Sequence, residues 1–118
     1  MAYFARMRTP EECAQAQLDA YNARDIEAFA AVYSHDVVLL DLKTGEPFCH
    51  GIDALRERYG TMFAEKTSLH CHLVNRMVCG NVAIDEEHVT GLRDDGIVHA
   101  IAIYETHQGL ITKAWFVR

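Results

Sequence analysis

Two polar residues interrupt the apolar pattern of residues 82–92, a stretch whose alternation predicts a β-strand. Val82 and Ile84 begin one face of this strand, and the same face continues with Glu86 and His88. A polar side chain in a core costs several kcal/mol unless it is paired or lies in a cavity. We therefore expect Glu86 and His88 to border a pocket. A solvated sheet edge or a dimer interface would explain both residues equally well.

A histidine interrupts the next predicted strand, residues 97–107. His99 stands within a series formed by Ile97, Ile101 and Ile103, so we expect it to lie inside the fold. There it could donate a hydrogen bond or act as an acid. The alternative is a core histidine whose hydrogen bonds are purely structural.

An aspartate, Asp41, follows the four apolar residues from Val37 to Leu40. At the end of a buried strand, desolvation would favour the neutral carboxyl and make Asp41 a candidate general base. The alternative is a turn cap, in which the carboxylate accepts hydrogen bonds from the backbone amides that follow it.

Two carboxylates and two histidines can together perform acid–base chemistry, such as isomerisation, dehydration, epimerisation or aldol-type cyclisation. The same set could hold a divalent metal ion. No local ligand spacing such as His-Glu-x-x-His is present, and we expect neither a metal nor a cofactor. The run His70-Cys71-His72 is not a ligand motif, because alternation along a strand turns Cys71 away from the two histidines.

Three predicted helices precede most of the strands. Thr9 and Glu12 have the spacing of a capping box, so a helix is expected to begin there. Asp25 is expected to cap a second helix, whose residues repeat at helical spacing as far as Tyr33. The third helix, which includes Tyr59, is expected after a His-Gly pair.

Four strands are predicted from Ser68 onward, over residues 68–79, 82–92, 97–107 and 110–117. Turn residues separate them in the manner of hairpins. Helices followed by a strand meander indicate the α+β class, with three helices packed on a strongly bent antiparallel sheet. The 118 residues contain no linker or repeat and are interpreted as one domain, residues 1–118.

The composition argues against several classes of function. The chain has 11 basic and 17 acidic residues, a formal charge of −6, and scattered basic side chains, which argues against a nucleic-acid partner. No apolar run approaches the roughly 18–20 residues of a membrane span, and we expect no signal peptide. The four cysteines form no Cys-x-x-Cys pair and are interpreted as reduced, which favours a cytoplasmic protein.

The stretch from Ala20 to Gly51 resembles a known family. It reads Asp25-Ile26-Glu27-Ala28, then Tyr33 and Asp36, an apolar strand that closes on Asp41, and His50-Gly51. This pattern is similar to that of the SnoaL-like and steroid Δ-isomerase-like branch of the nuclear transport factor 2-like superfamily. The resemblance covers nearly the whole chain. It implies a cone-shaped, cystatin-like fold with a pocket inside, and a homodimer formed through the outer face of the sheet.

The same resemblance assigns roles to individual residues. Asp41 stands at the position of the family's proton-transferring aspartate, and Tyr59 matches a tyrosine on its third helix. Gln17 and Ile101 stand where the family carries its oxyanion tyrosine and acid, which counts against standard steroid isomerisation. Trp115, on the last strand, is a further candidate for the pocket wall.

Two hypotheses follow. The first is a small, cofactor-independent enzyme of the isomerase or lyase type that acts on a hydrophobic carbonyl compound, with Asp41 as base and His99 as donor. The alternative is a non-catalytic domain of the same fold that binds a small ligand or mediates assembly. Substrate contacts are expected from Gln17, Tyr59, Glu86, His88, Ile101 and Trp115.

Overall fold

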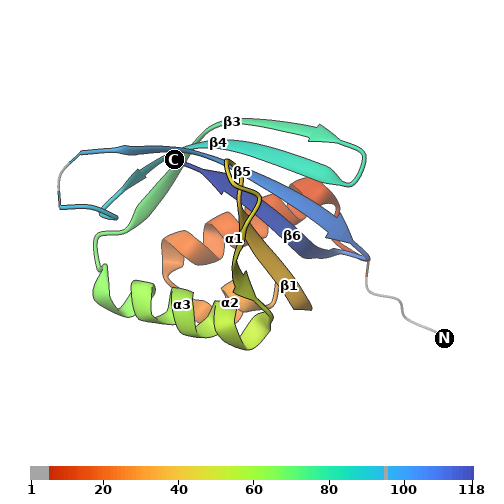
Figure 1. Cartoon of the computed structure of the whole chain (residues 1–118), viewed down its shortest axis with the longest axis horizontal. Helices are drawn as coiled ribbons and strands as arrows, with labels where there is room; N and C mark the ends of the chain where they lie inside the picture. Colours follow the sequence, from red (N-terminus) through yellow and green to blue (C-terminus); the bar gives the residue numbers. More distant parts are fainter. Residues whose placement is uncertain (1–5, 95) are drawn as a thin grey trace.

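The computed structural model describes residues 6–94 and 96–118, and this part of the chain forms three helices and six strands. In chain order they are α1 (Pro10–Ala23), α2 (Ile26–Ala30), β1 (Tyr33–Asp41), β2 (Pro47–His50), α3 (Ile52–Glu65), β3 (His70–Cys79), β4 (Val82–Thr90), β5 (Val98–His107) and β6 (Leu110–Val117). The predicted α+β class is confirmed (Figure 1).

The first two helices begin at the predicted capping residues. The Thr9 hydroxyl accepts a hydrogen bond from the Glu12 amide at 3.2 Å, and the Glu12 carboxylate accepts one from the Thr9 amide at 2.9 Å. The Asp25 carboxylate accepts a hydrogen bond from the Ala28 amide at 3.1 Å. Each side chain satisfies a backbone donor that the first helical turn leaves without a partner.

The second helix is shorter than its apolar spacing suggests. It ends at Ala30, and Tyr33 already belongs to β1, where it pairs with Ile111 of β6. The expectation that Tyr33 continues the helix is therefore wrong. Pairing with β6 outweighs the weak local preference of this segment for helix.

The six strands form one sheet in the order β2-β1-β6-β5-β4-β3. All neighbouring strands are antiparallel except β1 and β6, which are parallel, so the expectation of a wholly antiparallel sheet is wrong at this pair. The last strand returns to lie beside the first, with the α3 helix and four strands between them in the chain. Strand β2, which was not predicted, pairs with β1.

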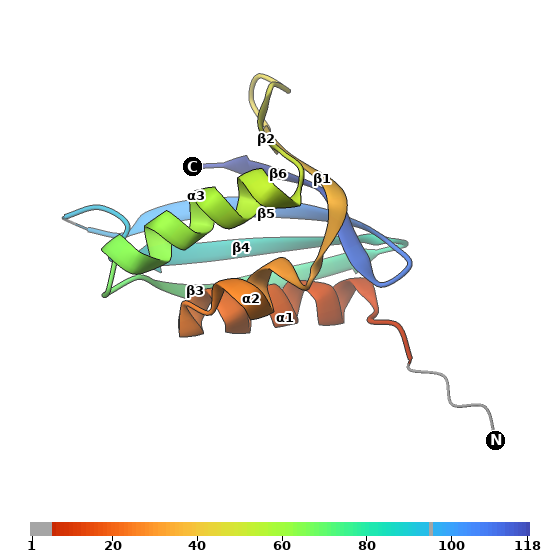
Figure 2. The same cartoon turned by 90° about the horizontal axis from the view of Figure 1, so that it is seen from below.

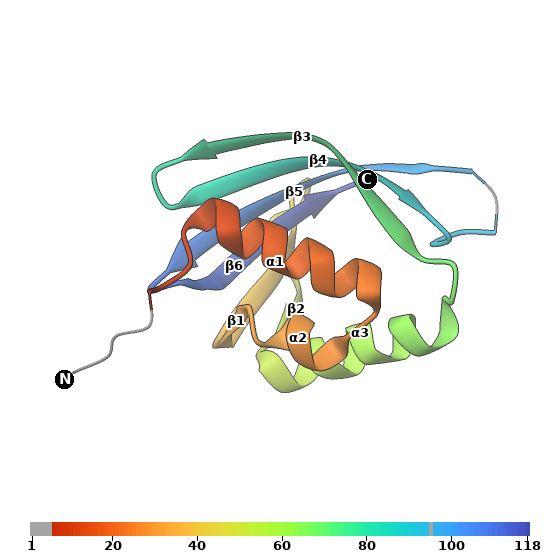
Figure 3. The ribbon, with the colours of Figure 1, turned by 180° about the vertical axis from the view of Figure 1, so that it is seen from behind.

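The three helices cover one face of this sheet (Figure 2). α1 packs against β3 to β6, whereas α3 packs against β1 and β2. From behind, α1 lies along the sheet, with α2 and α3 below it (Figure 3). The core fills the space between the two layers, and its largest fully buried apolar side chains include Phe29, Leu39, Leu55, Tyr104 and Ile111.

The outer face of the sheet is also apolar at its centre. Ile103 of β5 stands between Ile84 of β4 and Trp115 of β6 in the strand pairing, and all three side chains are half-buried. Both faces of these strands therefore carry large hydrophobic residues, which affects how their sequence pattern is interpreted.

Among the described residues, no helix is long and apolar enough to cross a membrane.

Candidate functional site

The inner face of β4 is the opposite of the one predicted. Asp85 and Glu87 are buried beneath the helices, with exposed fractions of 0% and 8%, whereas Glu86 and His88 are half-buried on the outer face. The expectation that Glu86 and His88 border an internal pocket is therefore wrong. A shift of one residue exchanges the two faces of a strand.

The histidine predicted to be internal also lies outside. Nε2 of His99 is 2.7 Å from Oε2 of Glu86, and the two side chains are 61% and 37% exposed. The rings of His88 and His99 meet edge to face, with centroids 5.2 Å apart. These three residues form a cluster on the outer sheet face, so none of them reaches the interior.

Two further predicted contact residues follow the same reversal. Ile101 pairs with Glu86 and Val117, and Trp115 pairs with Ile103, all on the outer face. The neighbouring aromatic residue of β6, Phe116, faces the interior instead. The placement of Ile101 and Trp115 in the pocket is therefore wrong.

Asp41 is exposed and caps a turn. One oxygen of its carboxylate accepts hydrogen bonds from the amides of Lys43 at 2.8 Å and Thr44 at 3.0 Å. The desolvation expected for this carboxyl is absent, because β1 ends here at the surface. Of the two roles expected for Asp41, the structure shows the turn cap.

Asp41→Ala is expected to lower the free energy of unfolding by about 1 kcal/mol, because two turn amides lose their acceptor but remain accessible to water. Asp41→Asn keeps an acceptor oxygen and should cost less. Urea unfolding of both variants measures the difference. Equal stability of wild type and Asp41→Ala would contradict the capping role.

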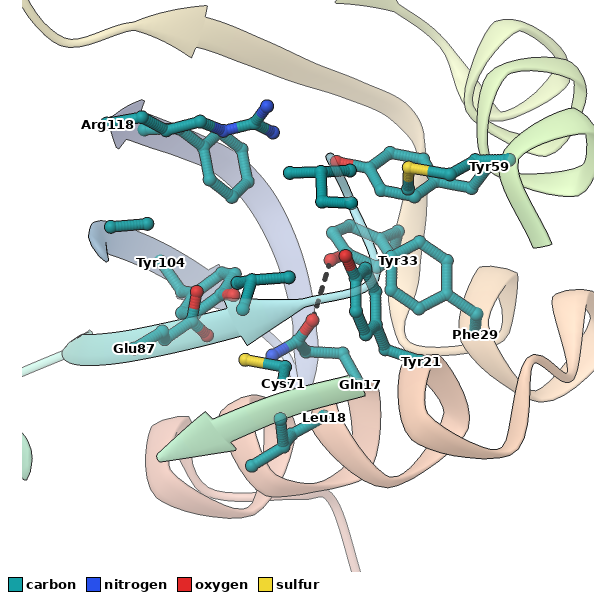
Figure 4. Close-up of a pocket in the computed structure, with 15 residues that line it drawn as sticks. Gln17, Leu18, Tyr21, Phe29, Tyr33, Tyr59, Cys71, Glu87, Tyr104 and Arg118 are labelled. Carbon is teal, nitrogen blue, oxygen red and sulfur yellow. Dashed lines mark hydrogen bonds between the residues drawn. The ribbon is translucent and has the colours of Figure 1, made fainter. Parts of the chain in front are cut away.

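An internal cavity lies between the helices and the inner sheet face (Figure 4). Its volume is about 40 Å³, enough for a few water molecules or the tip of a ligand. Its walls come from all three helices and from every strand except β2. They consist of Gln17, Leu18, Tyr21, Phe29, Tyr33, Tyr59, Met62, Cys71, Glu87, Val89, Leu92, Ala100, Tyr104, Phe116 and Arg118.

Two of the predicted contact residues do line this cavity. Gln17 is held in place by two hydrogen bonds: its Nε2 donates to the Ala14 carbonyl at 3.0 Å, and its Oε1 accepts from the Tyr33 hydroxyl at 3.4 Å (Figure 4). Tyr59 approaches from α3 and packs against Phe29, with ring centroids 4.7 Å apart. Gln17 and Tyr59 therefore lie at an internal cavity, and their contact with a substrate stays a prediction.

The one carboxyl among the lining residues belongs to Glu87. Burial raises its pKa from the ordinary 4.5 to about 7, and the nearby charge of Asp85 acts in the same direction. The Cys71 thiol and the cations Arg118 and Arg76 act against this rise. Near neutral pH this side chain is therefore present in both protonation states, as a group that takes up and releases protons requires.

Four tyrosines line the same cavity as this carboxyl. Burial raises the pKa of Tyr59 to about 12 and raises the pKa values of Tyr21, Tyr33 and Tyr104 still further. All four hydroxyls are therefore neutral at physiological pH and are able to donate hydrogen bonds. The cavity thus combines one titrating acid with several neutral donors.

A buried ion pair between Arg76 and Asp85 lies close to Glu87 in the sheet. Arg76 of β3 donates to both oxygens of Asp85, from Nε at 2.7 Å and from a terminal nitrogen at 3.0 Å. Its other terminal nitrogen donates to Gln15 of α1 at 2.9 Å, which ties the helix to the sheet. Arg76 thus neutralises the charge of Asp85, which lies two residues from Glu87.

Sequence reasoning missed Glu87 because Val82 and Ile84 suggested the wrong inner face. The signal that could have identified it lies on the neighbouring strand. Ala100 and Ala102 stand opposite Glu87 and Asp85, and small residues leave room beneath helices. Glu87 and its partner Ala100 both line the cavity.

A model of a family described as "SnoaL-like domain" matches residues 14–114. No protein with a curated description matches this sequence. Several solved structures share the fold. A cystatin-fold protein from Novosphingobium aromaticivorans superposes with a TM-score of 0.83 at 21% identity, over 94% of this chain and 99% of that one.

Two further structures carry names that refer to chemistry. A candidate polyketide cyclase from Sinorhizobium meliloti superposes with a TM-score of 0.75 at 20% identity, over 89% of this chain and 93% of that one. A candidate ketosteroid isomerase from Kribbella flavida superposes with a TM-score of 0.73 at 21% identity, over 91% of this chain and 75% of that one. At these identities the similarity shows a shared cystatin-like, nuclear transport factor 2-like fold.

Proposed function

Because the chain belongs to the SnoaL-like family, we propose that it is a cofactor-independent enzyme that moves a proton within a carbonyl compound whose reacting end enters the cavity. The observation that carries this proposal is Glu87, a buried carboxyl whose pKa of about 7 suits a group that takes and returns protons. Perturbed acids in cavities are candidates for function, because a purely structural carboxyl is normally paired.

The proposed reaction has two proton transfers. The Glu87 carboxylate removes a proton from the carbon next to the carbonyl, and the electron pair of that C–H bond moves toward the carbonyl oxygen. Neutral donors such as the Tyr59 hydroxyl stabilise the resulting enolate oxygen. The protonated Glu87 then returns its proton to a carbon of the enolate, which gives an isomer of the starting compound.

The names of two structural relatives are consistent with this class of reaction. One is a candidate ketosteroid isomerase and the other a candidate polyketide cyclase. Isomerisation of a ketosteroid uses a carboxylate base and hydrogen-bond donors at the carbonyl oxygen. This chain would use Glu87 of β4 as the base, because Asp41 is committed to a surface turn.

The test is deuterium exchange at carbons next to carbonyl groups, followed by NMR over a panel of ketones and enones. We expect exchange with wild-type protein and its loss in Glu87→Gln. Glu86→Gln is the matched control, since it makes the same change on the adjacent, outward-facing residue. Loss of exchange in Asp41→Asn with retention in Glu87→Gln would assign the base to Asp41. Absence of exchange with every compound would favour a domain that only binds its ligand.

We also infer that the outer sheet face pairs with a second copy of the chain. Ile84, Ile103 and Trp115 form its half-buried apolar centre, and the three helices lie over the opposite face of the sheet. Ile103→Glu is expected to convert a dimer into a monomer in sedimentation experiments, because it buries a charge at this centre. Ile97→Glu, at a loop isoleucine that is 62% exposed, is the matched control. A wild-type protein that sediments as a monomer would contradict the inference.

A further inference from the structure

A second hollow, which we call the outer groove, adjoins the internal cavity. It has a volume of about 440 Å³ and lies between the turn after β1, the α3 helix and the end of β6. Three of its lining residues, Lys43, Arg58 and Arg118, are cationic, and two, Asp41 and Glu46, are acidic. The volume is in the range of small-molecule sites, about 300–1,000 Å³.

The two arginines of the outer groove have no acidic partner among the residues that the structure describes. Within the described part of the chain, no carboxylate lies at ion-pair distance from Arg58 or Arg118. The guanidinium of Arg58 instead lies over the ring of Phe48, 4.7 Å from its centroid, where the aromatic face holds it without neutralising it. Asp41 accepts two turn amides through one of its carboxylate oxygens, and Glu46 is the other acid that lines the groove.

The outer groove and the cavity share two wall residues, Phe116 and Arg118. Figure 4 shows Arg118 at the rim of the cavity, on the same side as Tyr59. The positive charge of Arg118 lowers the pKa of both Tyr59 and Glu87, and that of Arg58 lowers the pKa of Tyr59. Both guanidinium groups are therefore electrostatically coupled to the cavity, although they face the groove.

We propose that the outer groove binds an acidic group of the substrate, so that the compound handled at Glu87 is an anionic carbonyl compound. This inference rests on the proposed function. The acidic group, a carboxylate or a phosphate, pairs with Arg58 and Arg118, and the carbonyl end passes Phe116 into the cavity.

The sizes and charges of the two hollows support this division. About 40 Å³ admits only the reacting end of a molecule, whereas about 440 Å³ accommodates the rest. Guanidinium groups bind carboxylate and phosphate through paired hydrogen bonds of fixed geometry. The chain as a whole carries a formal charge of −6, so an anion is attracted only where cations are gathered.

The experiment compares levulinate and its longer homologues with their methyl esters, in the exchange assay and in NMR titrations of binding. Because hydrogen bonds to charged groups are stronger than those between neutral groups, we expect the acids to bind at least about tenfold more tightly than the esters. Arg58→Gln and Arg118→Gln should each remove this preference. Arg56→Gln, on the same helix and outside the groove, is the matched control. Keto phosphonates of matched length distinguish phosphate from carboxylate as the acidic group.

The outcomes separate this inference from the proposed function. Exchange that depends on Glu87 but proceeds equally with acids and esters would overturn the anionic substrate and leave the enzyme intact. Binding of the acids that depends on Arg58 and Arg118, without exchange, would support the anion site and overturn the reaction. Equal affinity for acid and ester in wild type and in both arginine variants would overturn the inference whatever the exchange assay shows.

Discussion

Glu87→Gln is expected to abolish proton exchange and, at the same time, to stabilise the fold above neutral pH. Glutamine keeps the size of the side chain and an acceptor oxygen, but it cannot take up a proton. A positioned general base contributes about 10²–10⁴-fold to a rate, so exchange should fall by at least about a hundredfold. The loss should appear in kcat rather than in binding, because the shape of the cavity is retained.

The effect on stability follows from the raised pKa of Glu87. The folded protein holds this proton with a pKa of about 7, against an ordinary value of 4.5. The folded state therefore binds the proton more tightly than the unfolded state does. This contribution to stability is complete below the unfolded pKa and is lost as the pH rises through the folded pKa.

The size of this loss follows from the difference between the two pKa values. Each pKa unit corresponds to about 1.4 kcal/mol, so wild-type protein should lose about 3 kcal/mol of stability between acidic and alkaline pH through this group alone. Glu87→Gln remains neutral and does not lose it. The variant should match wild type near the ordinary pKa of glutamate and exceed its stability above neutral pH.

Urea unfolding of wild type, Glu87→Gln and the outward-facing Glu86→Gln between about pH 4 and pH 9 measures this divergence. Parallel stability curves for wild type and Glu87→Gln would show that Glu87 titrates normally, and the carboxyl would then lose its assignment as base. A variant that is more stable but inactive would show the trade-off between stability and activity that is typical of strained or desolvated active sites.

The beginnings of the helices and the extents of the strands could be predicted because they depend on local chemistry. Thr9 and Glu12 cap α1 through hydrogen bonds within four residues, and Asp25 does the same for α2. The predicted strands 82–92 and 97–107 correspond to β4 and β5 with ends that differ by one or two residues. Glycine and polar turn residues favour these ends through their local backbone preferences.

Which face of a strand lies inside could not be predicted in the same way. Alternation separates two sets of residues but does not say which set is covered when both contain large apolar side chains. On β4 the outer face holds Val82 and Ile84, whereas the buried face holds Ala83, Asp85 and Glu87. The helices pack over the smaller residues, because these leave room for the helix layer and for a cavity.

The sequence therefore predicts the helical residues of the candidate site, but not the residues that the sheet contributes. Gln17 and Tyr59 interrupt or complete helical stripes, and a helix has only one face toward the core. Asp41 was expected to be buried, but Leu40 is already half-buried and Asp41 is exposed at the end of β1. Its surface role depends on the turn that pairs β1 with β2, a strand too short and too irregular to be recognised from alternation.

Arg76→Met is expected to destabilise the fold by about 3–5 kcal/mol, because it leaves a buried charge without a partner. The side chain of Asp85 is fully buried and that of Arg76 is 10% exposed. The two hydrogen bonds from Arg76, at 2.7 and 3.0 Å, compensate the carboxylate for the water it has lost. Thermal and urea unfolding measure the loss.

A surface ion pair that also has two hydrogen bonds provides the control. Arg6 donates to both oxygens of Glu12, at 2.8 and 2.7 Å, but these side chains are 73% and 41% exposed. Because water and salt screen an exposed pair, Arg6→Met should change stability far less than Arg76→Met does. Similar losses in the two variants would show that burial does not determine the strength of the Arg76–Asp85 pair.

The double variant Arg76→Met/Asp85→Leu separates the cost of an unpaired charge from the cost of lost packing. Replacing a whole buried ion pair by hydrophobic side chains is often neutral or stabilising, so the double variant should recover most of the stability that Arg76→Met loses. In the wild type the charge of Asp85 raises the pKa of Glu87, and the charge of Arg76 lowers it. The double variant removes both charges. In Arg76→Met alone only the lowering charge is gone, so the pH at which exchange reaches half its maximum should move upward. An exchange profile that is unchanged in Arg76→Met, in protein shown to be folded, would mean that the ion pair supports the fold without tuning the acid.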